Sequence, residues 1–409
     1  MKAFEQISQR IEDYRDEMID MQLKLGSIPA ISPLNGGEGE TKKAEVLLSF
    51  LKEMGFKNIQ LIKAPDLDVP SGYRPNIIAY FQGENPEKTI WVMTHMDVVP
   101  EGEISLWDGD PFKPWIKEGK IFGRGAEDNQ QAMIASLYAI KALKTDGIKP
   151  KYNLGIALFA DEETGSKKGI EYVLNNTNFF EKKDLIIVPD TGEKEGTLIE
   201  VAEKSLLWIK FKTTGKQAHG STPNKGVNSL KAASYLITEL NSLYHHFNFK
   251  DSLFDPPFST FEPTKKEENI PNINTIPGED VFYMDCRILP HYSIEEVKEE
   301  IKKIVSRAEN KFNVNISLEE IQESPAAPPT PSNAPVVLAL KKAIKEVYKK
   351  NGKPTGIGGR TVATIFRRAN FYAACWSKTD DTAHQPNEYC IIDNMIGDSK
   401  VFAHIFTQE

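Results

Sequence analysis

Residues 89–97 read Thr-Ile-Trp-Val-Met-Thr-His-Met-Asp, an apolar run that ends on a histidine and an aspartate. Two more short apolar runs, 154–159 and 185–188, are each followed by acidic residues. Uninterrupted apolar runs of this length are typical of strands buried on both faces of a sheet. An amphipathic helix is predicted at 129–143, so strands and helices alternate along this part of the chain. The sequence therefore predicts an α/β domain with helices flanking a sheet.

The character of the sequence changes after about residue 203. Strand-like and helix-like segments follow one another in the order 204–213, 228–243, 282–288 and 294–312. This order predicts a smaller α+β domain, and the Pro-rich stretch 324–331 reads as the linker that returns from it. We therefore expect a discontinuous catalytic domain, 1–202 with 324–409, interrupted by an inserted domain at 203–323.

Composition excludes several classes of protein. A chain of 409 residues with 40% hydrophobic and 26% charged residues is typical of a globular protein with two domains. Its net charge of -8 argues against a nucleic-acid partner. The first 25 residues are charged throughout, so we expect neither a signal peptide nor a membrane span. Only three cysteines occur, in no metal-binding spacing, and this favours a reducing cytoplasm.

Candidate metal ligands come directly after the three apolar runs. Because ligands bind beyond the carboxyl ends of strands in open α/β sheets, we expect these side chains to meet at one edge. An acid at the start of the 129–143 helix and a histidine far downstream join them. The candidates are His95 and Asp97 after the first run, Glu162 and Glu163 after the second, Asp190 after the third, and then Asp128 and His384.

Each of these residues alone has a simpler interpretation. A histidine at a strand end is more often a hydrogen-bonded structural residue, Asp128 is suited to the first turn of a helix, and paired glutamates are usually solvated. Several acids at one buried edge, however, repel one another and are costly to desolvate without a cation among them. Two histidines and three carboxylates suit two zinc-like ions that share one bridging carboxylate.

These residues stand in motifs that resemble those of the M20 metallopeptidases, the group of carboxypeptidase G, succinyl-diaminopimelate desuccinylase, acetylornithine deacetylase, aminoacylase-1 and peptidase T. The matches keep their order over nearly the whole chain. They are His-x-Asp at 95–97, Gly-Arg-Gly-x-x-Asp at 123–128, Glu-Glu-x-Gly at 162–165, Asp190, and His-x-x-Asn-Glu at 384–388. The resemblance implies a zinc-peptidase-like catalytic domain with a mixed sheet, plus a ferredoxin-like inserted domain that serves as lid and dimerisation domain.

The resemblance also implies a role for each candidate. One divalent ion would bind His95 and Asp190, the other Glu163 and His384, with Asp128 bridging. Zinc is expected, and cobalt or manganese could substitute. Asp97 would accept a hydrogen bond from the second ring nitrogen of His95. Glu162 would be the general base that takes a proton from the metal-bridging water.

The inserted domain adds further candidates. The segment around His219 resembles the Gly-x-x-Ala-His motif of the family, and the resemblance implies that His219 reaches the neighbouring site of a homodimer. Asn274 stands in an Asn-x-Ile-Pro segment. Strand alternation places Arg287 where it would pair a substrate carboxylate, although a structural salt bridge explains it nearly as well. In the last part of the chain, Gly358 and Gly359 could offer backbone N–H groups to an anionic substrate end.

The sequence says least about the class of substrate. The family pattern is broken at Arg360, which puts an inherited specificity in doubt. Two alternatives stay open: a deacylase of N-acyl amino acids, which the chain as a whole favours, and a di- or tripeptidase, which the short acid Asp190 favours. A non-catalytic binding protein on the same fold is a third. The glycines at 123–125 lack the features of a nucleotide-binding loop.

Overall fold

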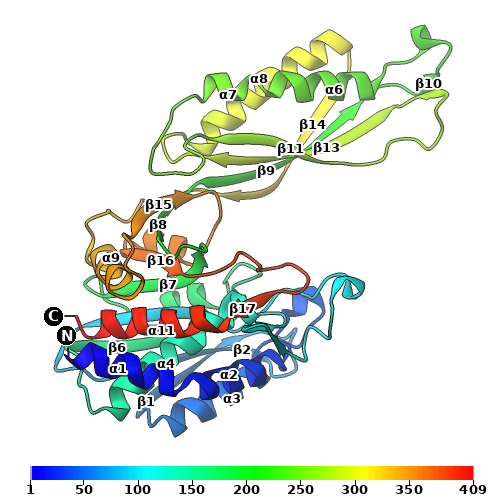
Figure 1. Cartoon of the computed structure of the whole chain (residues 1–409). Helices are drawn as coiled ribbons and strands as arrows, with labels where there is room; N and C mark the ends of the chain where they lie inside the picture. The colour runs from blue at the N-terminus through cyan, green and yellow to red at the C-terminus, as the bar shows by residue number, and fades with distance from the viewer. Residues whose placement is uncertain (1, 409) are drawn as a thin grey trace. The chain divides into compact units, whose positions relative to one another are not determined.

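The computed structural model describes residues 2–408, which form two compact units (Figure 1). The first unit comprises residues up to 201, with 330–354 and those from 361 onward. The second comprises 202–329 and 355–360, and so is larger than the predicted insert. The difference arises because Ala326 N donates to Ser205 Oγ and Gly356 N donates to Leu253 O, which ties both flanking segments to this unit.

The first unit is built on a mixed eight-stranded sheet. Its central strands β6, β3 and β7 are parallel, whereas the edge strand β1 pairs antiparallel with β2. In spatial order the strands are β1 (Asn58–Pro65), β2 (Tyr73–Phe81), β6 (Tyr152–Phe159), β3 (Asn85–His95), β7 (Leu185–Gly192), β16 (Ala373–Ser377), β8 (Leu198–Glu203) and β15 (Lys353–Ile357). The three predicted apolar runs are thus neighbouring strands, and their carboxyl ends lie at one edge.

Helices cover both faces of this sheet. Trp91 and Met93 of β3 pack in a core with α5 and α10, while α4 packs on the opposite face of β3 and β6. Trp91, Val92 and Met93 are all fully buried, as expected for strands covered on both sides. The helices of this unit are α1 (Lys2–Asp13), α2 (Arg15–Gly26), α3 (Thr41–Glu53), α4 (Ala132–Thr145), α5 (Ile170–Asn176), α9 (Pro335–Tyr348), α10 (Ala363–Arg368) and α11 (Ile392–Phe406).

The helix predicted at 129–143 begins later, at Ala132. Asp128 and Asn129 have non-helical backbone angles, with φ of -111° and -128°. No side chain caps the start of α4, so Asp128 does not have the capping role that its position suggested. The residues before α4 are instead held by contacts with distant loops.

A three-stranded sheet joins two of those loops. Its strands are β4 (Trp115–Lys117), β5 (Lys120–Phe122) and β17 (Tyr389–Ile391). Because β5 pairs antiparallel with β17, the chain at 123–128, which follows β5, lies beside the chain at 384–388, which precedes β17. Gly123 N donates to Glu388 O at 2.9 Å and extends this pairing.

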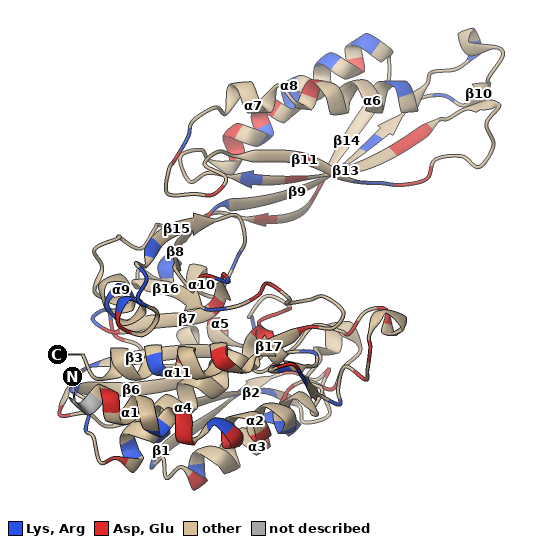
Figure 2. Ribbon diagram, in the orientation of Figure 1, with Lys and Arg blue, Asp and Glu red and all other residues tan. Residues whose placement is uncertain are grey.

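The second unit is a four-stranded antiparallel sheet with helices on one face. Its strand order, β11-β13-β9-β14, and its strand-helix-strand-strand-helix-strand sequence are those of a ferredoxin-like domain. Helix α8 begins with a capping box of Ser293 and Glu296. It carries acids in its first turn (Figure 2), where the positive end of the helix dipole stabilises their negative charge. The elements are β9 (Ser205–Thr214), α6 (Ser229–Leu240), α7 (Leu243–His246), β11 (Thr260–Lys266), β13 (Glu279–Ile288), α8 (Ile294–Phe312), β14 (Asn315–Ser324) and the short pair β10 (Ala218–His219) and β12 (Thr275–Ile276).

Across residues 2–408, every helix is either too short or too polar to cross a lipid bilayer. The interior of the first unit does contain buried charge. Arg367 of α10 forms two bonds of 2.7 Å with the carboxylate of Glu200 on β8, and both side chains are almost completely buried.

Removal of one partner from this buried pair should be costly. We expect Glu200→Ala to lower the free energy of unfolding by about 3–5 kcal/mol, because it leaves the Arg367 charge buried without its carboxylate. Urea unfolding of the purified variant measures the change. As a control, Glu38→Ala removes an exposed partner of Lys42 and should leave the midpoint almost unchanged. Equal effects of the two variants would contradict the importance given to the buried pair.

Candidate metal centre

The centre forms at the carboxyl edge of the eight-stranded sheet. His95 is the last residue of β3, and Asp190 lies near the end of β7. The register that pairs Val92 with Ile187 brings His95 level with Asp190 further along both strands. Since β6 runs parallel beside β3 and ends level with His95, the turn that follows β6 carries Glu162 to the same edge.

Asp128 lies between the two histidines. His95 Nε2 is 2.8 Å from Asp128 Oδ1, and His384 Nε2 is 3.2 Å from Asp128 Oδ2. Each histidine has one further carboxylate: Asp190 Oδ1 lies 3.3 Å from His95 Nε2, and Glu163 Oε2 lies 3.2 Å from His384 Nε2. The arrangement therefore has two halves that share one carboxylate.

Two overlapping groups of side chains offer donor atoms that lie within 4.8 Å of one another. One group is His95 with Glu162 and Asp190, and the other is His95 with Asp128 and Glu163. His95 is buried, whereas the His384 side chain is 53% exposed, so the centre opens to solvent on the His384 side. The sequence-predicted ligands are thus brought together from segments far apart in the chain.

The neighbouring acids raise the pKa of both histidines. Burial alone opposes a charge on His95, but the negative charge of Asp128 outweighs it and raises the pKa of His95 well above its usual value. Hydrogen bonds with Asp128 and Glu163 raise the pKa of His384 to about 10. In return, although burial disfavours its ionised form, the charge of His95 lowers the pKa of Asp128.

Unlike the pKa of Asp128, the pKa values of the two glutamates are raised. Burial, reinforced by the charge of Asp190, raises the pKa of Glu162 well above its usual range. Burial and the charge of Asp128 raise the pKa of Glu163 to about 7. Carboxylates packed this closely in a buried site disfavour each other's ionisation.

This donor set fits divalent cations. Imidazole nitrogens and carboxylate oxygens are ligands of zinc and related metals, and here they converge with like charges facing one another. Among these donors only the imidazoles can carry a positive charge, by taking up a proton. A cation between them would relieve the carboxylate repulsion and leave each imidazole free to bind as a neutral ligand.

The carboxylate of Asp97 lies near His95 but has other partners as well. His95 Nδ1 lies 3.0 Å from the backbone oxygen of Asp97 and 3.6 Å from its carboxylate, so the main chain makes the shorter contact with the ring. The carboxylate also accepts the backbone N–H groups of Glu162 and Glu163, at 3.1 and 3.0 Å. Asp97 thus connects the end of β3 to the Glu162–Glu163 turn.

Asn129 is a supporting residue that the sequence did not reveal. Its side-chain amide donates to Asp190 Oδ1 at 3.0 Å and to the backbone oxygen of Pro189 at 2.9 Å. Asn129 is buried, and this contact orients Asp190 toward His95. The only signal in the sequence was its position directly after Asp128.

Several predicted residues lie in the second unit. His219 is exposed at the end of β10, and its Nδ1 lies 2.8 Å from the hydroxyl oxygen of Ser221. Asn274 is also exposed, and its backbone oxygen accepts a hydrogen bond from Gly220 N at 2.7 Å. This last bond holds the segment of Asn274 beside the one that carries His219.

Arg287 is already paired within its own unit. Its Nε and Nη2 donate to the two oxygens of Asp285 at 2.7 and 3.0 Å, and Nη1 donates to the backbone oxygen of Gly358 at 2.8 Å. The salt bridge that the sequence left open is therefore present. Gly358 uses its carbonyl for this contact, while Gly359 and Arg360 beside it are exposed.

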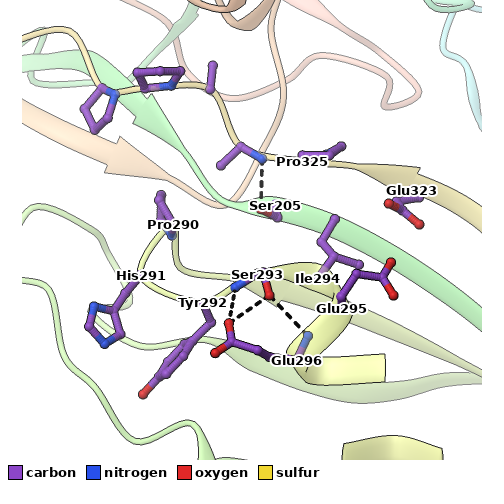
Figure 3. A pocket seen from close by; sticks show the side chains of 14 residues that line it. Ser205, Pro290, His291, Tyr292, Ser293, Ile294, Glu295, Glu296, Glu323 and Pro325 are labelled. Carbon is purple, nitrogen blue, oxygen red and sulfur yellow. Dashed lines mark hydrogen bonds between the residues drawn. The ribbon is translucent and has the colours of Figure 1, made fainter. Parts of the chain in front are cut away.

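The second unit also contains a hollow of about 730 Å³ (Figure 3). Prolines of the segment 325–329 line one side, and the start of α8 lines the other. There Ser293 N donates to Glu296 Oε2 and Glu296 N donates to Ser293 Oγ, so the capping box occupies these two N–H groups. No group of potential metal ligands among residues 2–408 lies in this hollow. His291 and three glutamates line it, but in the described chain none of them belongs to a converging group of donors.

Comparison with known proteins agrees with this geometry. The family model described as peptidase family M20/M25/M40 matches residues 91–408, which include every ligand candidate of the centre. The chain belongs to this family. Its fold and its motif resemblance to the M20 metallopeptidases are thereby confirmed, and the family implies the use of divalent metal.

Individual relatives extend over almost the full chain. A metallohydrolase of Methanocaldococcus jannaschii is 41% identical over 96% of this chain and 99% of its own. A succinyl-diaminopimelate desuccinylase of Nitratiruptor is 26% identical over 91% and 94%. Among solved structures, human carnosine dipeptidase 1 has a TM-score of 0.75 at 17% identity over 99% of this chain and 98% of its own. A metallo-carboxypeptidase of Sulfolobus solfataricus has a TM-score of 0.73 at 22% identity over 96% and 98%.

Proposed function

We propose that the chain hydrolyses the amide bond of a small N-acyl amino acid with two divalent cations, zinc in the first place. The observation that carries this proposal is Asp128, which presents one carboxylate oxygen to each of two histidines. A carboxylate so placed suits a bridge between two ions. His95 and Asp190 would hold one ion, and Glu163 and His384 the other.

The protein's own groups would move the proton. Cations bound here would supply Lewis acidity that polarises the substrate carbonyl and activates water. Glu162 takes a proton from the attacking water on a carboxylate oxygen and gives it to the leaving nitrogen as the C–N bond breaks. Asp97 holds the backbone of Glu162 and Glu163, so that adjacent residues can face different partners.

The two glutamates should separate by experiment. We expect about two divalent ions per chain purified without chelator, and Glu162→Gln should retain them while losing most of kcat, because only proton transfer is removed. Glu163→Gln should lose metal instead, since it removes a ligand. Elemental analysis together with kcat on N-acyl substrates measures both effects.

The outcomes that contradict this assignment are distinct. Wild-type protein without metal, and without activation by added zinc, cobalt or manganese, would refute the two-metal proposal. Loss of metal from Glu162→Gln, with metal retained by Glu163→Gln, would reverse the roles of the pair. Activity retained by Glu162→Gln would exclude it as the base.

We further propose that the chain acts as a homodimer through its second unit, with His219 contributing to the partner's site. Two features of this chain support the proposal. His219 is exposed and lies at the end of a short two-stranded extension, and only Ser221 bonds to its ring in the described chain. An imidazole on such an extension can donate a hydrogen bond to the developing oxyanion of a neighbouring site.

Mixed dimers test the contribution of His219. His219→Ala and Glu162→Gln homodimers should each be nearly inactive, whereas mixing them should restore part of the activity. Each heterodimer then contains one site with both groups intact. Activity is measured after subunit exchange has been verified by mass. Absence of recovery would place His219 in the site of its own subunit or outside catalysis.

Two substrate classes compete, and the deacylase is the one we propose. Several curated relatives are named succinyl-diaminopimelate desuccinylases, whereas solved structures of the same fold include dipeptidases and a tripeptidase. Arg287 uses three of its five N–H groups within its unit, and we propose the others for the substrate carboxylate in either class. The classes differ at the other end, where a peptide carries a free ammonium group.

Matched substrates decide between the classes. We expect kcat/KM for acetyl-methionine to equal or exceed that for alanyl-methionine, measured with both zinc and cobalt. A preference of a hundredfold for the free amine, about 2.7 kcal/mol of transition-state stabilisation, would assign the chain to the peptidases instead. Wild-type protein stripped of metal serves as the blank for both substrates.

A further inference from the structure

His384 is presented by a turn with an unusual backbone. Asp381 and His384 both have φ of 62°, in the left-handed region that residues other than glycine rarely adopt. Such conformations persist only where surrounding contacts determine them. The side chain of His384 is half-exposed, so burial of the ring does not hold the turn. Some other contact must do so.

That contact comes from Glu127. Its buried carboxylate accepts four hydrogen bonds from three residues of the turn, Asp380, Thr382 and Ala383. Oε1 accepts from Asp380 N at 2.6 Å, and Oε2 accepts from Thr382 N at 2.5 Å, from Thr382 Oγ1 at 2.9 Å and from Ala383 N at 3.1 Å. Hydrogen bonds to a carboxylate are stronger than those between neutral groups. Both carboxylate oxygens of Glu127 thus bind the segment that directly precedes His384.

A second carboxylate makes the reverse connection. Glu388 Oε1 accepts the backbone N–H groups of Glu127 and Asp128, at 3.0 and 3.1 Å, while its other oxygen accepts from Arg124 at 2.6 Å. Each loop therefore binds the backbone of the other through a buried glutamate. One loop carries Asp128 and the other His384, whose side chains face each other.

We propose that Glu127 is a positioning residue for the metal centre, whose carboxylate holds residues 380–383 so that His384 Nε2 faces Asp128 and Glu163. This inference rests on the proposed two-metal function, in which His384 is a ligand. In the sequence, Glu127 occupies one of the two unspecified positions of the Gly-Arg-Gly-x-x-Asp motif. The competing role is that of a buried acid which only stabilises the fold.

Metal titration separates the two roles. Glu127→Gln keeps the shape of the side chain but replaces one acceptor oxygen with an NH₂ group, which cannot accept an N–H. In chelator-stripped protein, we expect the first cobalt ion to bind as in wild type and the second to bind at least tenfold more weakly. Calorimetry gives both affinities, and the visible absorption of bound cobalt reports the ligand geometry.

Asp184→Asn is the matched control. Asp184 is also buried and accepts three N–H groups, from Thr89, Trp91 and Glu181, near the start of β3, at the end opposite His95. We expect Asp184→Asn to lower Tm but to leave both cobalt affinities unchanged. A loss of cobalt affinity in Asp184→Asn equal to that in Glu127→Gln would overturn the proposal, because it would show a general effect of lowered stability.

A double-mutant cycle tests whether Glu127 acts through His384. If it does, adding Glu127→Gln to His384→Ala should weaken cobalt binding no further. Equal weakening in both backgrounds would overturn the proposal. Should Glu127→Gln not fold, Glu127→Asp keeps the charge but withdraws the carboxylate by one methylene, and the same cycle applies with the same expected order.

Hydrogen exchange in metal-free protein separates this inference from the proposed function. We expect the amides of Thr382 and Ala383 to exchange at least tenfold faster in Glu127→Gln, with no change in Asp184→Asn. Unchanged exchange in Glu127→Gln would overturn the positioning role whatever the metal content. Wild-type protein that binds no cobalt, with faster exchange in Glu127→Gln, would refute the two-metal function but not the hold of Glu127 on the turn.

Discussion

Asp128 divides its two carboxylate oxygens between His95 and His384, and the rest of the centre depends on this contact. It joins a strand end to a loop from the last part of the chain. Each histidine also faces a second carboxylate, that of Asp190 for His95 and that of Glu163 for His384. These buried carboxylates repel one another, and this repulsion is the physical constraint on the site. Positive charge between the carboxylates offsets it.

The sheet makes such crowding achievable. Parallel strands end at one edge, so residues from separate segments meet without a long loop to carry them. Backbone contacts then limit their freedom, because Asp97 holds the Glu162–Glu163 turn and Asn129 holds Asp190. A ligand orientated by such neighbours loses less entropy when a cation binds, since its rotamer is already set.

The two units contribute in different ways. The first contains the whole donor set, whose geometry is fixed by hydrogen bonds within that unit. The second contains the residues that we propose for substrate or partner, and several of these are exposed or, like Arg287, paired internally. A relative of this chain is named a desuccinylase, whereas a solved structure of the same fold is named a dipeptidase, so the fold does not by itself select the substrate.

The sequence by itself determined the strands at the centre of the sheet and the residues that could bind metal, because apolar runs and motif spacing are local patterns. It placed the start of α4 too early and did not reveal that the carboxylate of Asp97 accepts the backbone N–H groups of Glu162 and Glu163, since both depend on contacts between distant segments. Only the tertiary structure decided what Glu127 does: its partner Thr382 lies 255 positions away. A hydrogen bond across such a separation leaves no periodicity in the sequence, so folding alone shows which buried acid supports which loop.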